Sequence, residues 1–200
     1  MNGKLWTIAV LAGAILMSGC AGKASDSDKE TNTVSSSEQN EKKATSGITA
    51  SNSLPLPVFF EATDIEAKEV SSAVFSESKL TMINVWATYC NPCLQEMPDL
   101  GELAGEYEKE EVQIIGIISD VQEGSDQDVL DAASGLIEET KADYPHLLVN
   151  ESLYKAMLTD VAVVPTTIFF DKHGIVLDTV TGSRTKDEWK EIIDGLLEEQ

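Results

Sequence analysis

A pair of cysteines directly after a β-rich run constrains the fold of this 200-residue chain more than any other feature. The run Lys79–Ala87 (KLTMINVWA) leads into Cys90-Asn91-Pro92-Cys93, and the only other cysteine is Cys20. Pro92 suits the first turn of a helix, where its missing N–H costs no hydrogen bond. The pattern therefore predicts a strand that ends at a CxxC motif on the N-terminus of a helix.

Three roles are open to such a pair: metal ligation, a structural disulfide, and redox chemistry. A structural zinc site needs four Cys or His ligands, and the only histidines, His146 and His173, are single and far apart in the sequence. A disulfide that closes a loop of two residues removes little entropy from the unfolded chain. We therefore expect no metal site, assign both histidines structural roles, and expect Cys90 and Cys93 to form a redox couple.

The first residues read as a targeting signal. Lys4 precedes an apolar run at residues 5–17 (LWTIAVLAGAILM), which is too short to span a bilayer comfortably. Met17-Ser18-Gly19-Cys20 resembles the lipobox of bacterial lipoprotein signal peptides, although Leu is usual at the place of Met17. We expect a signal peptide over residues 1–20 with lipid on Cys20. The alternatives are an uncleaved anchor and an ordinary signal with a chance cysteine.

Composition changes sharply after the signal. Residues 21–53 are rich in Ser, Thr, Asn, Lys, Asp and Glu, and such a segment cannot bury enough apolar surface to offset its ordering entropy. It is expected to be a disordered polar tether. Residues 1–53 contain five Lys and five acidic residues, so the formal charge of −21 falls wholly on residues 54–200. This acidic balance excludes nucleic-acid binding, which needs basic patches, and fits a solvated surface.

Hydrophobic patterns predict an α/β domain over residues 54–200. Two short apolar segments, Val58–Ala62 and Val70–Phe75, indicate an N-terminal hairpin, and a helical period runs from Leu94 to Tyr107. We then expect a strand at Val112–Ser119, a helix at Gln127–Lys141 and a strand at Leu147–Val149. A short helix at Ser152–Leu158 should follow. The chain should end with a hairpin of Thr166–Phe170 and Ile175–Val180 and a final helix at Thr185–Leu197. This order is typical of a layered fold with a mixed sheet.

The order of strand, Trp86, CxxC, long helix, Val164-Pro165-Thr166-Thr167, hairpin and helix resembles the thioredoxin fold. NVWATYCNPCLQEMPDL resembles more closely the TlpA/ResA-like thiol–disulfide oxidoreductases, which are extracytoplasmic and often lipoproteins. The resemblance covers residues 54–200. It implies a central mixed β-sheet flanked by helices, with an N-terminal β-hairpin and a helical insertion before Val164.

The motifs assign roles at the redox couple. Cys90 is expected to attack, because the N–H groups and the dipole at a helix N-terminus favour a thiolate. The resemblance implies that Cys93 is the resolving thiol. It also implies that Pro165 is cis beside the CxxC, where the backbone of Val164 pairs with the substrate chain.

Four more side chains surround the predicted site. Trp86 and Tyr89 are expected to shape the lip around Cys90. The resemblance places Glu96 near the thiols, where it influences their proton affinity; an exposed helix glutamate is the alternative. Asn84 stands where thioredoxin has a buried aspartate, so any relay of protons through a carboxylate must use Glu96 or be absent.

The resemblance implies a membrane-anchored, extracytoplasmic reductase of oxidised protein thiols with no cofactor beyond the Cys90–Cys93 disulfide. A membrane electron donor of the CcdA/DsbD kind would recycle it, and apocytochrome c or a methionine sulfoxide reductase is its implied client. The reducing direction is favoured because Asn91-Pro92 brings no positive charge and the domain is acidic, so a thiolate gains little stabilisation.

Three other functions stay open. The first is a disulfide-forming oxidant on the same fold. The second is a thiol peroxidase, which is disfavoured because Thr88 is two residues before Cys90, not three, and no proline precedes it. The third is a lipoprotein binding module with a vestigial CxxC.

Overall fold

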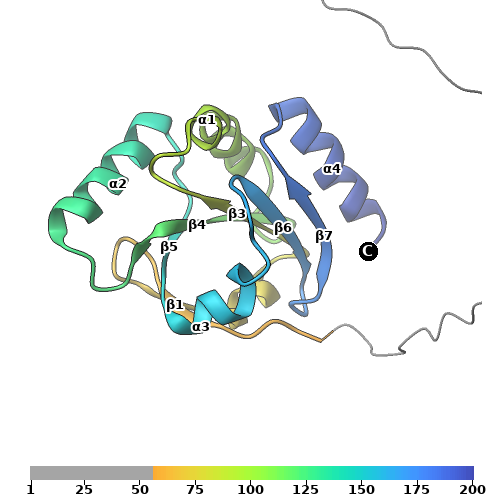
Figure 1. The fold of residues 1–200 in the computed structure, drawn as a ribbon. Helices are drawn as coiled ribbons and strands as arrows, with labels where there is room; N and C mark the ends of the chain where they lie inside the picture. Colours follow the sequence, from red (N-terminus) through yellow and green to blue (C-terminus); the bar gives the residue numbers. More distant parts are fainter. Residues whose placement is uncertain (1–55) are drawn as a thin grey trace, which may run out of the picture. The chain divides into compact units, whose positions relative to one another are not determined.

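The computed structural model describes residues 56–200 (Figure 1). The predicted signal peptide, the predicted tether and Cys20 lie outside these residues.

A five-stranded sheet forms the centre of the domain, with the order β5-β4-β3-β6-β7. Its strands are β3 (Leu80–Trp86), β4 (Val112–Gln122), β5 (His146–Val149), β6 (Thr166–Asp171) and β7 (Val176–Thr181). β3 pairs with β4, and β4 with β5, in parallel, whereas β6 pairs antiparallel with both β3 and β7. A separate antiparallel hairpin joins β1 (Glu61–Thr63) to β2 (Glu69–Ser71). The predicted mixed sheet and N-terminal hairpin are confirmed.

Helices and the hairpin cover the two faces of the sheet (Figure 1). On one face lie α1 (Asn91–Glu106), α2 (Gln127–Thr140) and α4 (Lys186–Glu198). The hairpin, a 3-10 helix η1 (Ser72–Glu77), α3 (Glu151–Leu153) and a π-helix η2 (Tyr154–Leu158) lie on the other. Every residue of β3 is consequently buried, as its nearly continuous apolar sequence requires.

Side chains alternate between the two cores along β3. Met82 and Trp86 pack in the core under the three long helices, whereas Ile83 and Val85 pack in the core beneath the hairpin. Asn84 therefore belongs to the face that α1 covers. This alternation places one polar side chain of the central strand directly below the helix that carries Cys93.

Several predicted segments differ from the structure in their bounds. β1 begins at Glu61 rather than Val58, and β4 continues to Gln122, three residues beyond the predicted end at Ser119. The predicted second apolar segment, Val70–Phe75, is a strand only to Ser71, because the Ser71 side chain accepts a hydrogen bond from the backbone N–H of Ala73 and begins η1. The short helix predicted at Ser152–Leu158 begins one residue earlier. Its cap is Asn150, which accepts from the N–H of Leu153, and the helix widens into η2 after Leu153.

Candidate active site

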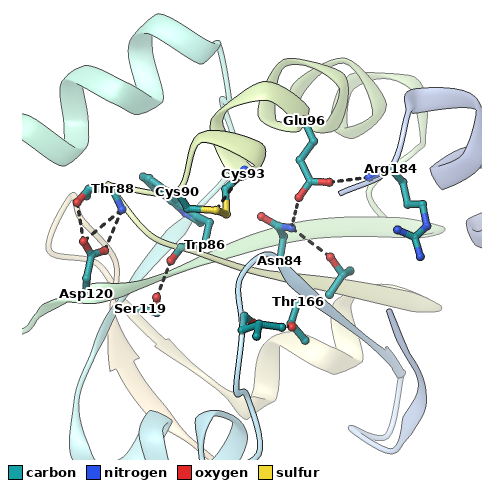
Figure 2. The surroundings of a disulfide bond; sticks show 12 residues. Asn84, Trp86, Thr88, Cys90, Cys93, Glu96, Ser119, Asp120, Thr166 and Arg184 are labelled. Atoms are coloured by element: carbon teal, nitrogen blue, oxygen red, sulfur yellow. Dashed lines mark hydrogen bonds between the residues drawn. A yellow bond between two sulfur atoms is a disulfide. The ribbon is translucent and has the colours of Figure 1, made fainter. Parts of the chain in front are cut away.

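Cys90 and Cys93 form a disulfide at the N-terminus of α1 (Figure 2). Cys90 caps the helix, and its Sγ accepts a hydrogen bond from the backbone N–H of Cys93 at 3.3 Å. Pro92 lies in the first turn, as predicted. Cys90 is 7% exposed and Cys93 is fully buried. Cys90 therefore keeps a small exposed surface that its partner lacks.

The end of β4 holds the loop that leads into the disulfide. Both carboxylate oxygens of Asp120 accept from the backbone N–H of Thr88, and the Thr88 hydroxyl also donates to Asp120 (Figure 2). Next to it, the Ser119 hydroxyl donates to the carbonyl oxygen of Trp86 at 2.8 Å. These contacts could not be predicted, because nothing in the linear pattern links two polar residues late in one strand to the loop after another strand.

The Val164–Pro165 peptide bond is cis, which confirms the prediction from the family resemblance. Pro165 is buried and Val164 is half-buried. The carbonyl oxygen of Pro165 accepts from the N–H of Gly182 at 2.9 Å, which ties this loop to the end of β7.

An apolar cavity of about 220 Å³ opens between the CxxC loop and the loop before Pro165. Its lining is Tyr89, Ser119, Tyr154, Leu158 and Val161–Val164. Tyr89 is 74% exposed, which agrees with its predicted place at the lip. The predicted place of Trp86 at the lip is wrong, because its side chain is fully buried and its Nε1 donates to His146 Nδ1 at 3.1 Å.

Glu96 is buried, with only 3% of its surface exposed, so the alternative of an exposed helix glutamate is wrong. Its Oε1 accepts from Asn84 Nδ2 at 3.2 Å. Its Oε2 accepts from the backbone N–H of Arg184 at 3.1 Å and from Trp189 Nε1 at 3.3 Å. Burial raises the pKa of Glu96, although these three donors oppose the rise. Arg184 and Trp189 could not be predicted as partners of Glu96, because they lie 88 and 93 residues away from it in the sequence.

His146 is a buried structural residue. Its Nδ1 accepts from Trp86, and its Nε2 lies 3.0 Å from the carbonyl oxygen of Ala142, so a neutral ring with its proton on Nε2 satisfies both contacts. Burial lowers the pKa of His146 to about 4. Gly116 makes room for the ring, because a Cβ there would lie 2.2 Å from His146 Nδ1. His173 is exposed in the turn between β6 and β7.

Positive charge is missing from the segment that carries the couple: Thr88–Leu94 contains no Lys, Arg or His. Within residues 56–200, no three His, Cys, Asp or Glu side chains are grouped to hold a metal ion.

A family model described as AhpC/TSA matches residues 55–179, which is more than half of the chain. The chain belongs to the AhpC/TSA family. A thiol-disulfide oxidoreductase ResA from Bacillus thuringiensis subsp. konkukian is 28% identical over 134 residues, which cover 67% of this chain and 72% of that protein. With such relatives and an accessible CxxC disulfide, this family member is a thiol–disulfide oxidoreductase.

Solved structures agree with the fold. A thiol:disulfide interchange protein of the thioredoxin family from Chlorobium tepidum superimposes with a TM-score of 0.62 at 23% identity, over 73% of this chain and 99% of that one. An exposed lipoprotein thioredoxin from Streptococcus pneumoniae gives a TM-score of 0.57 at 24% identity, over 68% of this chain and 98% of that one. The thioredoxin-like fold is thus established on both sequence and structure.

Proposed function

We propose that this family member is an extracytoplasmic reductase of oxidised protein thiols, in which Cys90 attacks and Cys93 resolves. The observation that supports the assignment is the unequal burial of the two cysteine residues, since Cys90 is 7% exposed and Cys93 is fully buried. A mixed disulfide on Cys90 keeps Cys93 directly behind it, where the second thiol can release the reduced client.

The surroundings of Cys90 support the reducing direction. A strongly oxidising couple needs a strongly stabilised thiolate. Here the segment Thr88–Leu94 has no cation, and Glu96 places a carboxylate in the same buried region. The Thr88 hydroxyl is bonded to Asp120, which gives no support to a peroxidase arrangement around Cys90.

Lipid attachment at Cys20 is part of the proposal. The lipobox-like Met17-Ser18-Gly19-Cys20 supports it, as does the similarity to a pneumococcal exposed lipoprotein. Residues 21–53 would then be a spacer that leads to the domain. Within residues 56–200, every helix is too short or too polar to cross a bilayer. A membrane donor of the CcdA/DsbD kind would supply the electrons.

Client binding is proposed at the rim of the disulfide. The backbone of Val164 beside the cis proline would pair with an extended client chain, and the apolar cavity beside Tyr89 would take a side chain next to the client cysteine. Buried Trp86 supports the site from below, without touching the client. By family resemblance, the client is apocytochrome c or a methionine sulfoxide reductase.

Trapping tests the order of attack. In cells that produce Cys93→Ala, mixed disulfides with client proteins should accumulate through Cys90, because the resolving thiol is gone. Cys90→Ala is the matched control and should trap almost nothing. The reverse pattern would overturn the assignment.

Equilibration with glutathione tests the direction. We expect the disulfide to dominate even in an excess of reduced glutathione, with a reduction potential of about −260 mV or lower, which is at or below the glutathione pool. A couple that glutathione readily reduces would instead identify the chain as a disulfide-forming oxidant.

A further inference from the structure

Two buried side-chain polar atoms among residues 56–200 lack a hydrogen-bond partner, Tyr144 Oη and Asn84 Oδ1, and the second lies beside the disulfide. The Asn84 side chain is fully buried, and its Nδ2 donates to Glu96 Oε1 at 3.2 Å and to Thr167 Oγ1 at 3.1 Å. Its Oδ1 has no hydrogen-bond partner among residues 56–200. An unpaired buried acceptor destabilises the fold, so an amide held in this way by its nitrogen needs an explanation.

The orphaned oxygen faces the redox couple. Asn84 lies on β3 between Met82 and Trp86, on the face that α1 covers. The bond from Nδ2 to Glu96 fixes the amide under the first turns of α1. Figure 2 shows the amide nitrogen turned toward Glu96 and the amide oxygen turned toward the sulfur of Cys93.

A disulfide sulfur has no hydrogen to donate, whereas a thiol has one. We propose that Asn84 Oδ1 is the acceptor for the Cys93 S–H that forms when the disulfide is reduced. The oxygen of this amide then has a hydrogen-bond partner only in the reduced protein. The proposal rests on the proposed exchange through Cys90 but does not depend on the client.

Thiol–disulfide exchange with a dithiol donor accounts for the two electrons that reduce the disulfide, and water supplies the proton on Cys93. A thiolate of a dithiol donor attacks Cys90 Sγ, the bond between Cys90 and Cys93 breaks, and its electron pair passes to Cys93 Sγ. That sulfur takes up a proton from water and becomes the S–H that Asn84 accepts. The second donor sulfur then attacks the mixed disulfide, which releases Cys90 as a thiolate and leaves the donor oxidised.

Two effects follow at Cys93. The bond exists only in the dithiol form, so Asn84 shifts the equilibrium toward the reduced protein. It also favours the thiol over the thiolate, because an amide oxygen carries partial negative charge. The ionisable groups packed around this pair are Cys90 and Glu96 from α1 and Tyr144 from the same core, while Thr167 on β6 is neutral.

Asn84→Leu tests the proposal in the full chain with Cys20→Ser, so that only two cysteines remain. In a glutathione redox buffer, we expect the equilibrium constant to shift about three- to tenfold toward the disulfide, the value of one lost hydrogen bond. Thr167→Val is the matched control. It removes an acceptor of Asn84 Nδ2 but leaves Oδ1 in place, and should change the constant by less than about twofold. An unchanged constant in Asn84→Leu, or equal shifts in both variants, would overturn the proposal.

A second measurement distinguishes the two orientations of the amide: the direction in which Asn84→Leu shifts the pKa of Cys93. In the full chain with Cys20→Ser and Cys90→Ser, ultraviolet absorbance of the thiolate reports the pKa of Cys93. Asn84→Leu should lower this pKa, because the acceptor that favours the thiol is gone. A rise would mean that the amide nitrogen faces the sulfur, and the proposal would be wrong.

If Asn84→Leu does not fold, the proposal can still be tested in the protein with Cys20→Ser and Cys90→Ser and with Asn84 intact. There the infrared S–H stretch of Cys93 shows whether the thiol donates a hydrogen bond. A frequency typical of a hydrogen-bonded thiol is expected, and the frequency of a free thiol would contradict the proposal. None of these measurements needs a client or a membrane donor. A chain that fails as a reductase but shows this bond would therefore overturn the proposed function alone.

Discussion

Glu96 is a buried carboxylate. Two opposed effects determine its proton affinity. Burial raises its pKa, and hydrogen bonds from Asn84, Arg184 and Trp189 lower it, with a net rise. A carboxyl group with a raised pKa is a better proton acceptor near neutral pH than an exposed one. When it is ionised, it also repels a nearby thiolate.

Glu96→Gln should separate these two effects. Removal of the negative charge should make the Cys90 thiolate form more readily, and the rate of Cys90 alkylation at a fixed, mildly acidic pH should rise by up to about tenfold. Loss of the proton acceptor should slow the resolving step about tenfold or more. Alkylation rates against pH and stopped-flow reduction of the mixed disulfide measure the two effects.

Glu102→Gln is the matched control, because it makes the same change on the exposed side of α1, where Glu102 pairs with Lys186. It should leave both rates unchanged. If both curves for Glu96→Gln overlay the parent, the carboxylate has no part in the thiol chemistry.

His146 gives the stability of the folded chain a pH dependence of known sign. Its pKa is about 4 in the folded chain because of burial, and about 6.5 in an unfolded chain. Between these values the unfolded chain binds more protons, so the free energy of unfolding falls as pH falls from about 6.5 toward 4. The slope is at most about 1.4 kcal/mol per pH unit.

Urea unfolding of His146→Gln against pH checks this contribution. The variant should lose that slope relative to the parent, whatever its overall stability. Comparison with the parent cancels the contribution of Glu96, which has the opposite sign because its pKa is raised in the fold. His173→Gln changes the exposed histidine and should keep the parent's slope. Parallel curves for parent and His146→Gln would contradict the assignment.

At the scale of elements, Asp120 near the end of β4 holds the CxxC loop through its hydrogen bonds from Thr88. Asp120→Ala removes the bonds to Thr88 and should lower the free energy of unfolding of the oxidised protein by about 1–2 kcal/mol. The looser loop should also slow reaction at Cys90. Urea unfolding and thiol-exchange rates measure these effects.

Asp120→Asn keeps an oxygen that can accept from the Thr88 N–H, so it should retain much of the lost stability. Equal values for the parent, Asp120→Ala and Asp120→Asn would mean that this exposed contact contributes nothing measurable.

Hydrophobic periodicity predicted the strands and long helices because burial follows the local pattern of apolar residues. β3 is apolar except at Thr81 and Asn84, and α4 presents Trp189 and Ile193 on one side. Where the predictions differ from the structure, a side chain ends the pattern. Ser71 turns a strand into η1 through a cap that apolar spacing does not reveal.

The parts of the site that consist of short sequence motifs were predicted, whereas contacts between distant segments were not. The CxxC couple and the cis Pro165 carry sequence motifs, so they were found. The lip position of Trp86 was wrong, because alternation along β3 directs it toward His146 in the core. The contacts of Glu96 with Arg184 and of Thr88 with Asp120 join distant segments, and only the fold brings them together.

At the scale of the whole molecule, the proposed attachment to a membrane would depend on Cys20, which lies outside the described residues. Cys20→Ala should release most of the protein from the membrane fraction or stall its processing, because a lipobox without its cysteine cannot be lipidated. Fractionation and immunoblotting measure this. Cys93→Ala keeps the lipobox and should remain with the membrane. An unchanged membrane fraction for Cys20→Ala would contradict the lipoprotein assignment.

The hydrogen bond from the N–H of Val58 to the carbonyl oxygen of Gly174 fixes where the chain enters the domain. Gly174 follows β6, whose Asp171 lies opposite Leu80, whereas its Thr166 lies opposite Val85 near the disulfide. The chain thus enters at the far end of the sheet, about 20 Å from Cys90 by the length of β3. Residues 56–58 therefore lie away from the surface around Cys90, so a client protein that covers this surface would not meet the start of the domain.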